Sequence, residues 1–303
     1  MDQGSKRKAR ATLVEVAELA LVSKSTVSRV INEDAAVSEE ARQRVLDAIR
    51  ATGYRVNQSA RALVSNKTGA IAVAIYEQLA TYFTSSFSGA MVTALQDFFF
   101  EKDLQVLILP APNRERQKRI EKYIYEGHVD GAILLGPVRE DILLSDLLSA
   151  QVPIVVGGRP IGSDSVSYVD IDNAKASELA VQELIRSSRK TIGFITGQLS
   201  NASATDRLRG YKLAIEGSDA KDDETLIGIA DWGYESAAIA TRKLLEQHPN
   251  LDAIFCSNDL MATAAIAVIR DSGRKIPEDI AVIGFDDSPI ALRTTPQLTS
   301  VAQ

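Results

Sequence analysis

Two kinds of hydrophobic periodicity divide the chain. Between residues 12 and 53 the apolar residues recur at helical spacing, and Leu13, Val16, Ala17 and Ala20 follow the i, i+3, i+4, i+7 pattern of one helix face. After residue 69 the pattern changes to short, wholly apolar runs separated by amphipathic stretches. The pattern therefore predicts a small helical unit followed by a larger region of alternating strands and helices.

Capping residues give the helix boundaries in the first part. Thr12 and Glu15 have the spacing of a capping box, and Ser23 can cap a second helix a few residues after the first. Ser38 can cap a third helix, which ends at Gly53, a natural residue for a left-handed C-terminal turn. The expected inward residues of the second and third helices are Val27, Val30, Ile31, Ala41, Val45 and Ile49. Two capped helices joined by so short a connection predict a helix-turn-helix.

The second part reads as two α/β lobes. Apolar runs at 71–77, 104–111, 129–136 and 152–158 are followed by the runs VSYVDID, KTIGFITG, LDAIFCSND and IAVIGFDD. Strands without a polar alternate are buried on both faces, which is typical of parallel sheets covered by helices. We expect two such sheets, joined near residues 159–165, with a ligand bound beyond the carboxyl ends of the strands.

Charge is distributed unevenly along the chain. The formal net charge is −6, yet residues 1–67 hold 12 Lys/Arg against 8 Asp/Glu, including the run SKRKAR at residues 5–10. The remaining residues hold 22 Lys/Arg and 32 Asp/Glu. A cationic head on an acidic body suggests that the head binds a polyanion. A solvated basic tail is the alternative that charge alone leaves open.

Several classes of protein are disfavoured by composition. The single Cys256 excludes an internal disulfide and fits a reducing cytoplasm, and with His128 and His248 it provides too few ligands for a His/Cys zinc site. No apolar run reaches the roughly 18 residues of a membrane span, and no apolar segment of a secretory signal follows the basic N-terminus.

The second helix presents a polar face outward. With its apolar residues buried, Lys24, Ser25, Ser28 and Arg29 point away from the core. These side chains can reach base edges and phosphates in a major groove. Any solvated helix face has a similar composition, and only the combination with the capped helix pair and the basic flank favours DNA.

Polar and aromatic residues gather after the predicted strands. Asp286 can accept paired hydroxyls, Arg207 can donate a two-pronged fork, and Asn258 can do both. Trp232, Tyr82 and Phe83 can cover the flat face of a sugar or a nucleobase. Each residue also has a structural alternative: a surface ion pair for Arg207, the core for Trp232, and a turn cap for the acids.

The first part resembles a known family of regulators. VAELALVSKSTVSRVIN followed by VSEEARQRVLDAIRATGYRVNQSARAL is similar, from Thr12 to Leu63, to the DNA-binding head of the lactose-repressor (LacI/GalR) family. By this resemblance Lys24, Ser25 and Arg29 read bases, while the contacts to phosphates or helix caps are made by Thr26, Ser28 and Asn32.

The same resemblance implies a hinge helix in residues 57–66. Asn57 can cap it, and Ala60 and Leu63 share one face. The family uses the leucine that matches Leu63 as a wedge in the minor groove, where apolar side chains kink DNA. So short a helix is marginal alone and is expected to order when two copies pair on DNA. A plain linker helix is the alternative.

The resemblance continues through the second part. VDGAILL, VDIDN, DRLRGY, AIFCSNDLMATAAIAVI and IPEDIAVIGFDD are similar to the family's effector-binding core, which resembles a periplasmic sugar-binding protein. The positions that match its ligand contacts are Tyr82, Phe83, Asp172, Arg207, Trp232, Asn258 and Asp286.

The chain departs from the family in four places. Leu21 stands where the family has Gly in the helix-turn-helix turn, and a leucine with positive φ costs about 1–2 kcal/mol. Val56 replaces a Pro, and Ala80-Thr81 replaces Asn-Pro. The family also continues some tens of residues beyond Gln303, so a fragment or a missing part of the effector core is expected, with poor solubility.

These observations predict a fold and a function together. We expect an all-α helix-turn-helix domain (residues 1–56), a hinge (57–68) and a two-lobed α/β domain like a periplasmic binding protein (69–303, lobes 69–160 and 163–290). The expected function is a cytoplasmic transcription regulator, more often a repressor than an activator, without cofactor or metal. Its DNA site is expected to be a pseudo-palindrome bound by a homodimer. Met91, Leu95 and Phe98–Phe100 can supply part of the dimer surface.

The same residues suggest a mechanism of control by a ligand, and two other functions compete with it. An effector held by Arg207, Asn258 and Asp286, a sugar first and a nucleobase or nucleoside second, is expected to change the angle between lobes and so the pairing of the hinge helices. One rival is a solute receptor for transport, which the missing signal segment disfavours. The other is an enzyme, for which only a weak Mg²⁺ pair, Asp286-Asp287, is present and no nucleotide-binding motif.

Overall fold

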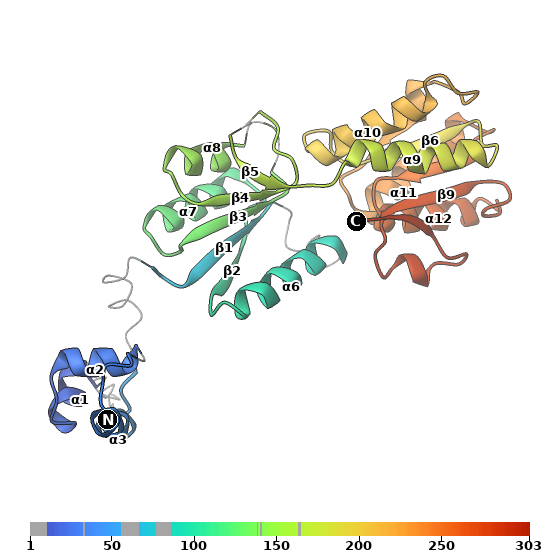
Figure 1. Cartoon of the computed structure of the whole chain (residues 1–303). Helices are drawn as coiled ribbons and strands as arrows, with labels where there is room; N and C mark the ends of the chain where they lie inside the picture. The colour runs from blue at the N-terminus through green and yellow to red at the C-terminus, as the bar shows by residue number, and fades with distance from the viewer. Residues whose placement is uncertain are drawn as a thin grey trace, which may run out of the picture. The chain divides into compact units, whose positions relative to one another are not determined.

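The structure is a computed structural model that describes residues 11–32, 34–55, 67–76, 86–137, 139, 141–162 and 165–303. The chain divides into two compact units, Met1–Thr68 and Gly69–Gln303, whose elements are labelled in Figure 1. The predicted hinge helix with Asn57, Ala60 and Leu63, and the aromatic pair Tyr82-Phe83, lie outside the described residues.

The first unit contains the three predicted helices, α1 (Leu13–Leu19), α2 (Lys24–Ile31) and α3 (Glu39–Thr52). The predicted caps are confirmed. Thr12 and Glu15 form a reciprocal capping box, and Ser23 and Ser38 accept hydrogen bonds from backbone N–H groups in the first turns of α2 and α3. Gly53 ends α3 in the left-handed conformation, with φ 64°.

One apolar core holds these helices together. Its buried members are Val16, Ala17, Ala20, Val27, Val30, Val45 and Ala48, with Leu13, Ile31 and Ile49 packed against them. Leu21, in the turn between α1 and α2, has a φ of 55° and is 85% exposed. The φ is therefore positive, which is the condition under which a leucine here has a cost, and its side chain gains little burial to offset that cost.

The first lobe of the second unit is a parallel sheet with the order β2-β1-β3-β4-β5. Its strands are β1 (Ala70–Ile75), β2 (Gln105–Pro110), β3 (Gly131–Leu135), β4 (Ile154–Gly157) and β5 (Ser167–Val169). Helices α7 (Arg114–Tyr125) and α8 (Ile142–Ser149) pack on the face that contains Ala72 and Ala74, and α6 (Ser86–Phe100) packs on the face of Val73 and Ile75. Helices cover both faces of the interior strand β1, which explains why all of its residues are apolar.

The second lobe repeats this plan with the strand order β10-β9-β8-β6-β7, again all parallel. Its strands are β6 (Ile192–Thr196), β7 (Ile227–Ile229), β8 (Ala253–Cys256), β9 (Ala281–Asp286) and β10 (Thr299–Ala302). Helices α9 (Asn173–Arg186) and α10 (Ala202–Ile215) cover one face, and α11 (Tyr234–Gln247) and α12 (Asp259–Asp271) cover the other (Figure 1). Two short 3₁₀ turns, η1 (Glu224–Leu226) and η2 (Ala291–Arg293), complete this lobe.

The predicted parallel sheets flanked by helices are thus confirmed, with two differences of detail. Edge strands β7 and β10 were not among the predicted runs. The run VSYVDID was predicted to belong to the second lobe, but its strand β5 pairs with β4 at the edge of the first sheet, and all three residues of β5 are exposed. In the second lobe the carboxyl ends of β6, β8 and β9 share one edge, which brings together residues from distant parts of the sequence.

Candidate effector site and DNA-binding helix

Helix α2 presents the predicted polar face to solvent. Lys24, Ser25, Ser28 and Arg29 are exposed, while Val27 and Val30 are buried in the core. Thr26 is partly buried, and its Oγ1 lies 2.8 Å from Oγ of Ser23. Asn32 is exposed and forms the C-cap of α2. The described part of the helix-turn-helix therefore offers four exposed side chains on α2, and ties Thr26 to the cap.

Arg29 has a carboxylate neighbour in the loop after α2. Its Nε lies 3.9 Å from Oδ2 of Asp34, and both side chains are well exposed. The backbone of Asp34 is fixed at both ends, since its N–H donates to the carbonyl of Arg29 and its carbonyl accepts from Nη2 of Arg42. So exposed a pair is weak, which leaves Arg29 available to a stronger partner.

The centre of the second lobe is a buried arginine. Arg207 on α10 is only 5% exposed. Its Nε donates to Oδ1 of Asn173 at 2.8 Å, its Nη1 donates to the carbonyl of Ser257, and Nη1 lies 3.9 Å from Oδ1 of Asp286. The guanidinium also stacks over an aromatic ring, with Cζ 3.5 Å from the centroid of Phe285. The Phe285 ring covers one face of the guanidinium, and oxygen acceptors fix its Nε and Nη1.

The guanidinium of Arg207 is a charged group that is largely removed from solvent. Burial lowers the pKa of Arg207 to about 10, while the nearby carboxylates of Asp286, Asp170 and Asp259 act in the opposite direction. At neutral pH it therefore remains charged. A fixed, partly desolvated guanidinium is a strong donor to hydroxyl or carboxylate oxygens.

Three non-glycine residues near Arg207 have positive φ. Trp232, whose ring centroid lies 5.8 Å from Cζ of Arg207, has a φ of 72°, and Asp286 and Asp287 have φ of 105° and 49°. The indole also fills the space over Gly197, where an added Cβ would stand 2.1 Å from its Cε2. Bulky residues seldom adopt positive φ, and strain of this kind is common at functional sites.

Asn258 fixes Trp232 in this position. Its Oδ1 accepts from the N–H of Met261 and so caps α12, while its Nδ2 donates to the carbonyl of Trp232 at 3.1 Å. The structure thus brings Arg207, Trp232, Asn258 and Asp286 together, as the family resemblance implied. Their contact with an effector stays a prediction.

Asp172 lies at the edge of this group. It is exposed, and its carboxylate caps α9 by accepting from the N–H of Lys175. The neighbouring Asn173, 2% exposed, is the residue that contacts Arg207. Sequence reasoning missed Asn173, Ser257 and Phe285. The motif VDIDN contains Asn173, but only the start of α9 turns it inward while Asp172 turns out.

Asp259 stabilises the loop that follows β9. It is 1% exposed and accepts from the N–H and Oγ of Ser288 at 2.7 and 2.9 Å and from Oγ of Ser300 at 2.5 Å. Burial raises the pKa of Asp259, and these hydrogen bonds act against that rise. Since Ser300 also accepts from the N–H of Asp287, one carboxylate ties α12, β10 and the Asp286-Asp287 turn together.

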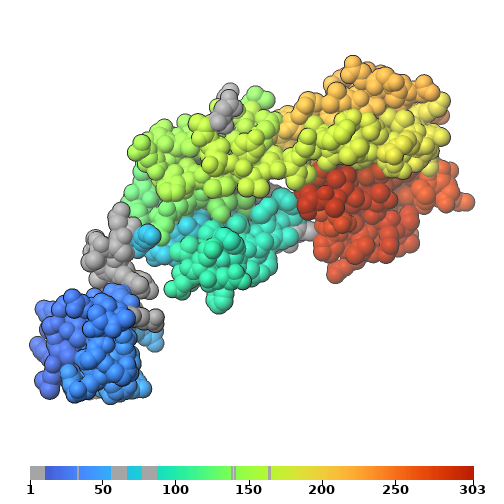
Figure 2. Space-filling view, in the orientation of Figure 1, coloured from blue at the N-terminus to red at the C-terminus, as the bar shows by residue number. Residues whose placement is uncertain are grey.

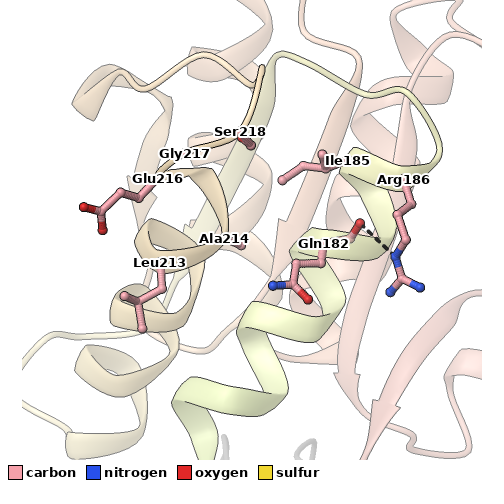
Figure 3. Close-up of a pocket in the computed structure, with 8 residues that line it drawn as sticks. All are labelled: Gln182, Ile185, Arg186, Leu213, Ala214, Glu216, Gly217 and Ser218. Atoms are coloured by element: carbon pink, nitrogen blue, oxygen red, sulfur yellow. Dashed lines mark hydrogen bonds between the residues drawn. The ribbon is translucent and has the colours of Figure 1, made fainter.

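A surface cavity of about 330 Å³ between α9 and α10 is a poorer candidate for the ligand site. It is lined by Gln182, Ile185, Arg186, Leu213, Ala214, Glu216, Gly217 and Ser218 (Figure 3). Nine residues of α9, about 13 Å of helix, separate Gln182 from Asn173. The cavity includes none of the motif residues, and the Arg186 side chain donates to the backbone carbonyl of Gln182.

The part of the chain that the structure describes holds neither a metal cluster nor a helix able to span a membrane. No cluster of three or more His, Cys, Asp or Glu side chains is arranged to hold a metal ion. No helix in the described ranges has the length and apolar character needed to cross a membrane.

Comparison with known proteins decides the family. The family model described as "Bacterial regulatory proteins, lacI family" matches residues 12–57, and the model described as "Periplasmic binding protein-like domain" matches residues 181–303. The transcriptional regulator CelR of Thermobifida fusca is 40% identical over 299 residues, which is 98% of this chain and 88% of CelR. The chain belongs to the lacI family of bacterial regulatory proteins. Catabolite control protein A of Priestia megaterium is 32% identical over 96% of this chain and 87% of that protein.

Solved structures of lacI-family members share its fold. A transcriptional regulator CelR–cellobiose complex superimposes with a TM-score of 0.76 at 38% identity, and covers 97% of this chain and 88% of the other. The lac repressor dimer bound to operator and the anti-inducer ONPF gives a TM-score of 0.85 at 25% identity over the same shares. The resemblance to the LacI/GalR family and the predicted fold class are confirmed.

Proposed function

We propose that this lacI-family protein is a sequence-specific DNA-binding regulator of transcription, acting as a repressor, and that a sugar controls its DNA binding. The family assignment, the helix-turn-helix fold and the exposed face of α2 support the first half. The buried Arg207 centre, together with the cellobiose complex of the similar CelR, supports the second.

DNA recognition is assigned to α2 and the hinge. Lys24, Ser25 and Arg29 would read base edges, and Thr26, Ser28 and Asn32 would contact phosphates or support the helix. Arginine binds guanine through two acceptors, which fits an Arg29 whose Asp34 contact is long. Asn57, Ala60 and Leu63 would form the minor-groove segment.

Effector binding is assigned to the second lobe. Arg207 and Asp286 would bind sugar hydroxyls as donor and acceptor, and Trp232 would cover the apolar face of the ring. Asn258 acts here by holding Trp232. Asp172, Tyr82 and Phe83 complete the proposed set.

The assembly follows from the way such heads read DNA. One head reads one half-site, so a homodimer on a pseudo-palindromic duplex is the expected complex. The relatives are transcription regulators rather than enzymes, and we extend the absence of enzymatic activity and a cytoplasmic location to this chain. Domain boundaries at residues 56 and 68 belong to the same proposal.

The observation that carries the proposal is the buried Arg207, fixed between an aromatic ring and oxygen acceptors beside Asp286. Isothermal titration with cellobiose, other disaccharides, monosaccharides and nucleosides tests the ligand class, with Arg207→Lys as the control. A sugar that binds the wild type and loses about tenfold or more in affinity to Arg207→Lys supports it, because Lys cannot reproduce the fork. Binding of nucleosides alone would overturn the sugar assignment.

DNA binding is tested separately by selecting duplexes from a randomised library and measuring affinity at several salt concentrations. Phosphate contacts release counterions, so the logarithm of the affinity should fall steeply and linearly with the logarithm of salt. Because both side chains are assigned to base edges, Lys24→Ala and Arg29→Ala should each lose preference at one base position. No enrichment of any duplex would contradict the regulator assignment.

A further inference from the structure

A closed ring of polar contacts surrounds the link between the two sheets. Asp170 follows β5, the last strand of the first sheet, and Asn173 begins α9 of the second lobe. Asn173 Nδ2 donates to Oδ1 of Asp170 at 2.9 Å, and Asn173 Oδ1 accepts from Nε of Arg207 at 2.8 Å. The amide of Asn173 therefore links Arg207, through its oxygen, to Asp170, through its nitrogen.

Arg159, in the loop after β4, closes the ring from the other side. Its backbone N–H donates to Oδ2 of Asp170 at 2.8 Å. Its Nε and Nη2 donate to Oδ2 of Asp206 at 3.1 and 2.9 Å. Because Asp206 directly precedes Arg207 on α10, the contacts return to the arginine from which they started.

The two oxygens of Asp170 are both engaged in this ring. Oδ1 also accepts the N–H of Ile171, while Oδ2 accepts the N–H of Arg159. A carboxylate with fixed partners on both oxygens has little rotational freedom, and Asn173 is 2% exposed. The position of Asn173, and through it the plane of the Arg207 guanidinium, is thus set by the segment between the sheets.

One donor of Arg207 is left over for a ligand. Nε and Nη1 have their acceptors in Asn173 and Ser257, whereas Nη2 has no hydrogen-bond partner among the described residues and is not solvent-excluded. Nη2 can therefore offer both of its N–H groups to an effector without breaking a contact of the protein.

We propose that Asn173 and Asp170 are positioning residues that aim Nη2 of Arg207 at the effector, and that Arg159 completes their support from the first lobe. The inference rests on the proposed effector site at Arg207. It adds that the aim of this donor depends on contacts made on both sides of the link between the sheets. A ligand held by Nη2 and a displacement of that link then act on the same set of hydrogen bonds.

A matched pair of arginine variants tests the ring. Arg159 and Arg209 both pair with Asp206 through their side chains, but Arg209 does so within α10 at 3.5 Å and lies outside the ring. Arg159→Ala opens the ring at Asp206 and keeps the backbone N–H that donates to Asp170. NMR of the arginine Nε–H groups in the full chain follows hydrogen exchange at Arg207 without any ligand. Arg159→Ala should raise the exchange rate of that Nε–H at least about tenfold, whereas Arg209→Ala should leave it unchanged. An Nε–H equally protected in Arg159→Ala and wild type would overturn the proposal.

A double-mutant cycle separates positioning from general loss of packing. Asn173→Ala removes the acceptor of Nε directly, so it should show the larger effect on exchange. If one ring supports Arg207, the double variant Arg159→Ala/Asn173→Ala should exchange no faster than Asn173→Ala alone. If the increases in exchange rate multiply in the double variant, the two residues support Arg207 independently, and the proposal of a single ring is wrong.

Effector affinity gives the functional readout, with cellobiose as the probe. Asn173→Ala should weaken cellobiose binding about tenfold and Arg159→Ala less, with Arg209→Ala unchanged. If the wild type does not bind cellobiose, the sugar assignment is weakened, yet the exchange experiment still decides the ring. If the wild type binds and Asn173→Ala binds equally well, the positioning role is wrong while the effector site stands.

Discussion

Among the non-glycine residues with positive φ, Leu21 and the group around Arg207 differ in what surrounds them. Trp232, Asp286 and Asp287 adopt them within the group around Arg207, where Asn258 and Asp259 hold the backbone in place. Leu21 adopts one in an exposed turn, and no side chain contact of comparable kind accompanies it. Strain at the first three residues is compensated by the surrounding contacts, whereas strain at Leu21 is a plain loss of stability.

Replacing Leu21 by Gly should therefore stabilise the helix-turn-helix. Relief of about 1–2 kcal/mol is partly offset by the greater freedom of glycine in the unfolded chain, about 0.4–1 kcal/mol. We expect a net gain of about 0.5–1 kcal/mol in the urea unfolding of the first unit. Leu19→Gly, the same exchange at an exposed helical residue, should instead lose up to about 1 kcal/mol. A loss of stability in Leu21→Gly would contradict this account of the turn.

Gly197→Ala should displace the indole of Trp232. The added methyl group would stand 2.1 Å from Cε2, so the ring has to leave the position that it holds beside Arg207. We expect sugar affinity, measured by titration calorimetry, to fall about tenfold or more. Gly193→Ala on the same strand is the control, because its Cβ would press on Leu244 and Leu251 and lower stability without touching Trp232. Equal affinity in Gly197→Ala and wild type would separate Trp232 from effector binding.

At the level of the elements, capping chemistry was the most informative signal in the sequence. Thr12, Ser23, Ser38 and Gly53 set the ends of α1, α2 and α3 because each satisfies a backbone group that the helix leaves unpaired. Short edge strands such as β7 and β10 escaped prediction, since a strand of three or four residues at the rim of a sheet has only a brief burial pattern.

Helix α6 shows how an exposed apolar stripe bears on assembly. Phe87, Met91, Ala94 and Phe98 lie within a narrow arc at helical spacing, on a helix that lies at the surface of the first lobe (Figure 2). Phe87 and Phe98 are 41% and 52% exposed. The predicted contribution of this helix to a dimer therefore rests on this stripe, while Leu95 packs against the sheet.

Phe98→Asp should weaken the proposed homodimer. A carboxylate in an apolar interface costs its desolvation, and we expect the dimer dissociation constant from sedimentation to rise at least about tenfold. Phe100, two residues further and on another side of the helix, supplies the control, and Phe100→Asp should leave association unchanged. Unchanged sedimentation of Phe98→Asp would remove α6 from the interface.

On the scale of the whole molecule, topology determines what the sequence reveals about the site. Arg207 and Asp286 were predicted to meet because parallel strands bring their carboxyl ends to one edge. Asn173 and Phe285 were not predicted, because their inward direction depends on how α9 and α10 pack, which short motifs do not encode. The glycine of the family at the position of Leu21 raised the question of a positive φ, and the structure has one there.

Stability of the second unit should depend on pH through Asp259. Burial raises the pKa of Asp259 in the folded state above its unfolded value of 3.8, so the folded state binds the proton more tightly. The contribution of Asp259 to the free energy of unfolding is therefore greatest below pH 3.8. It is lost as pH rises from 3.8 to the pKa of the folded state, by about 1.4 kcal/mol per pH unit.

The comparison of wild type with Asp259→Asn isolates this effect. The variant should be less stable throughout, because an amide N–H₂ cannot accept from Ser288 or Ser300. The difference in unfolding free energy between the two proteins should shrink as pH rises from about 4 towards 8. A difference that grows with pH would show that the pKa of Asp259 is lowered on folding.

One practical consequence follows from the place of Trp232. It is the single tryptophan of the chain, and it lies beside Arg207 within the group proposed to bind the effector. Intrinsic fluorescence of the unlabelled protein therefore comes from that one location when tryptophan is excited selectively. Quenching or a spectral shift on adding a compound would therefore report binding near Trp232, and ligands can be screened by the fluorescence of the unlabelled protein.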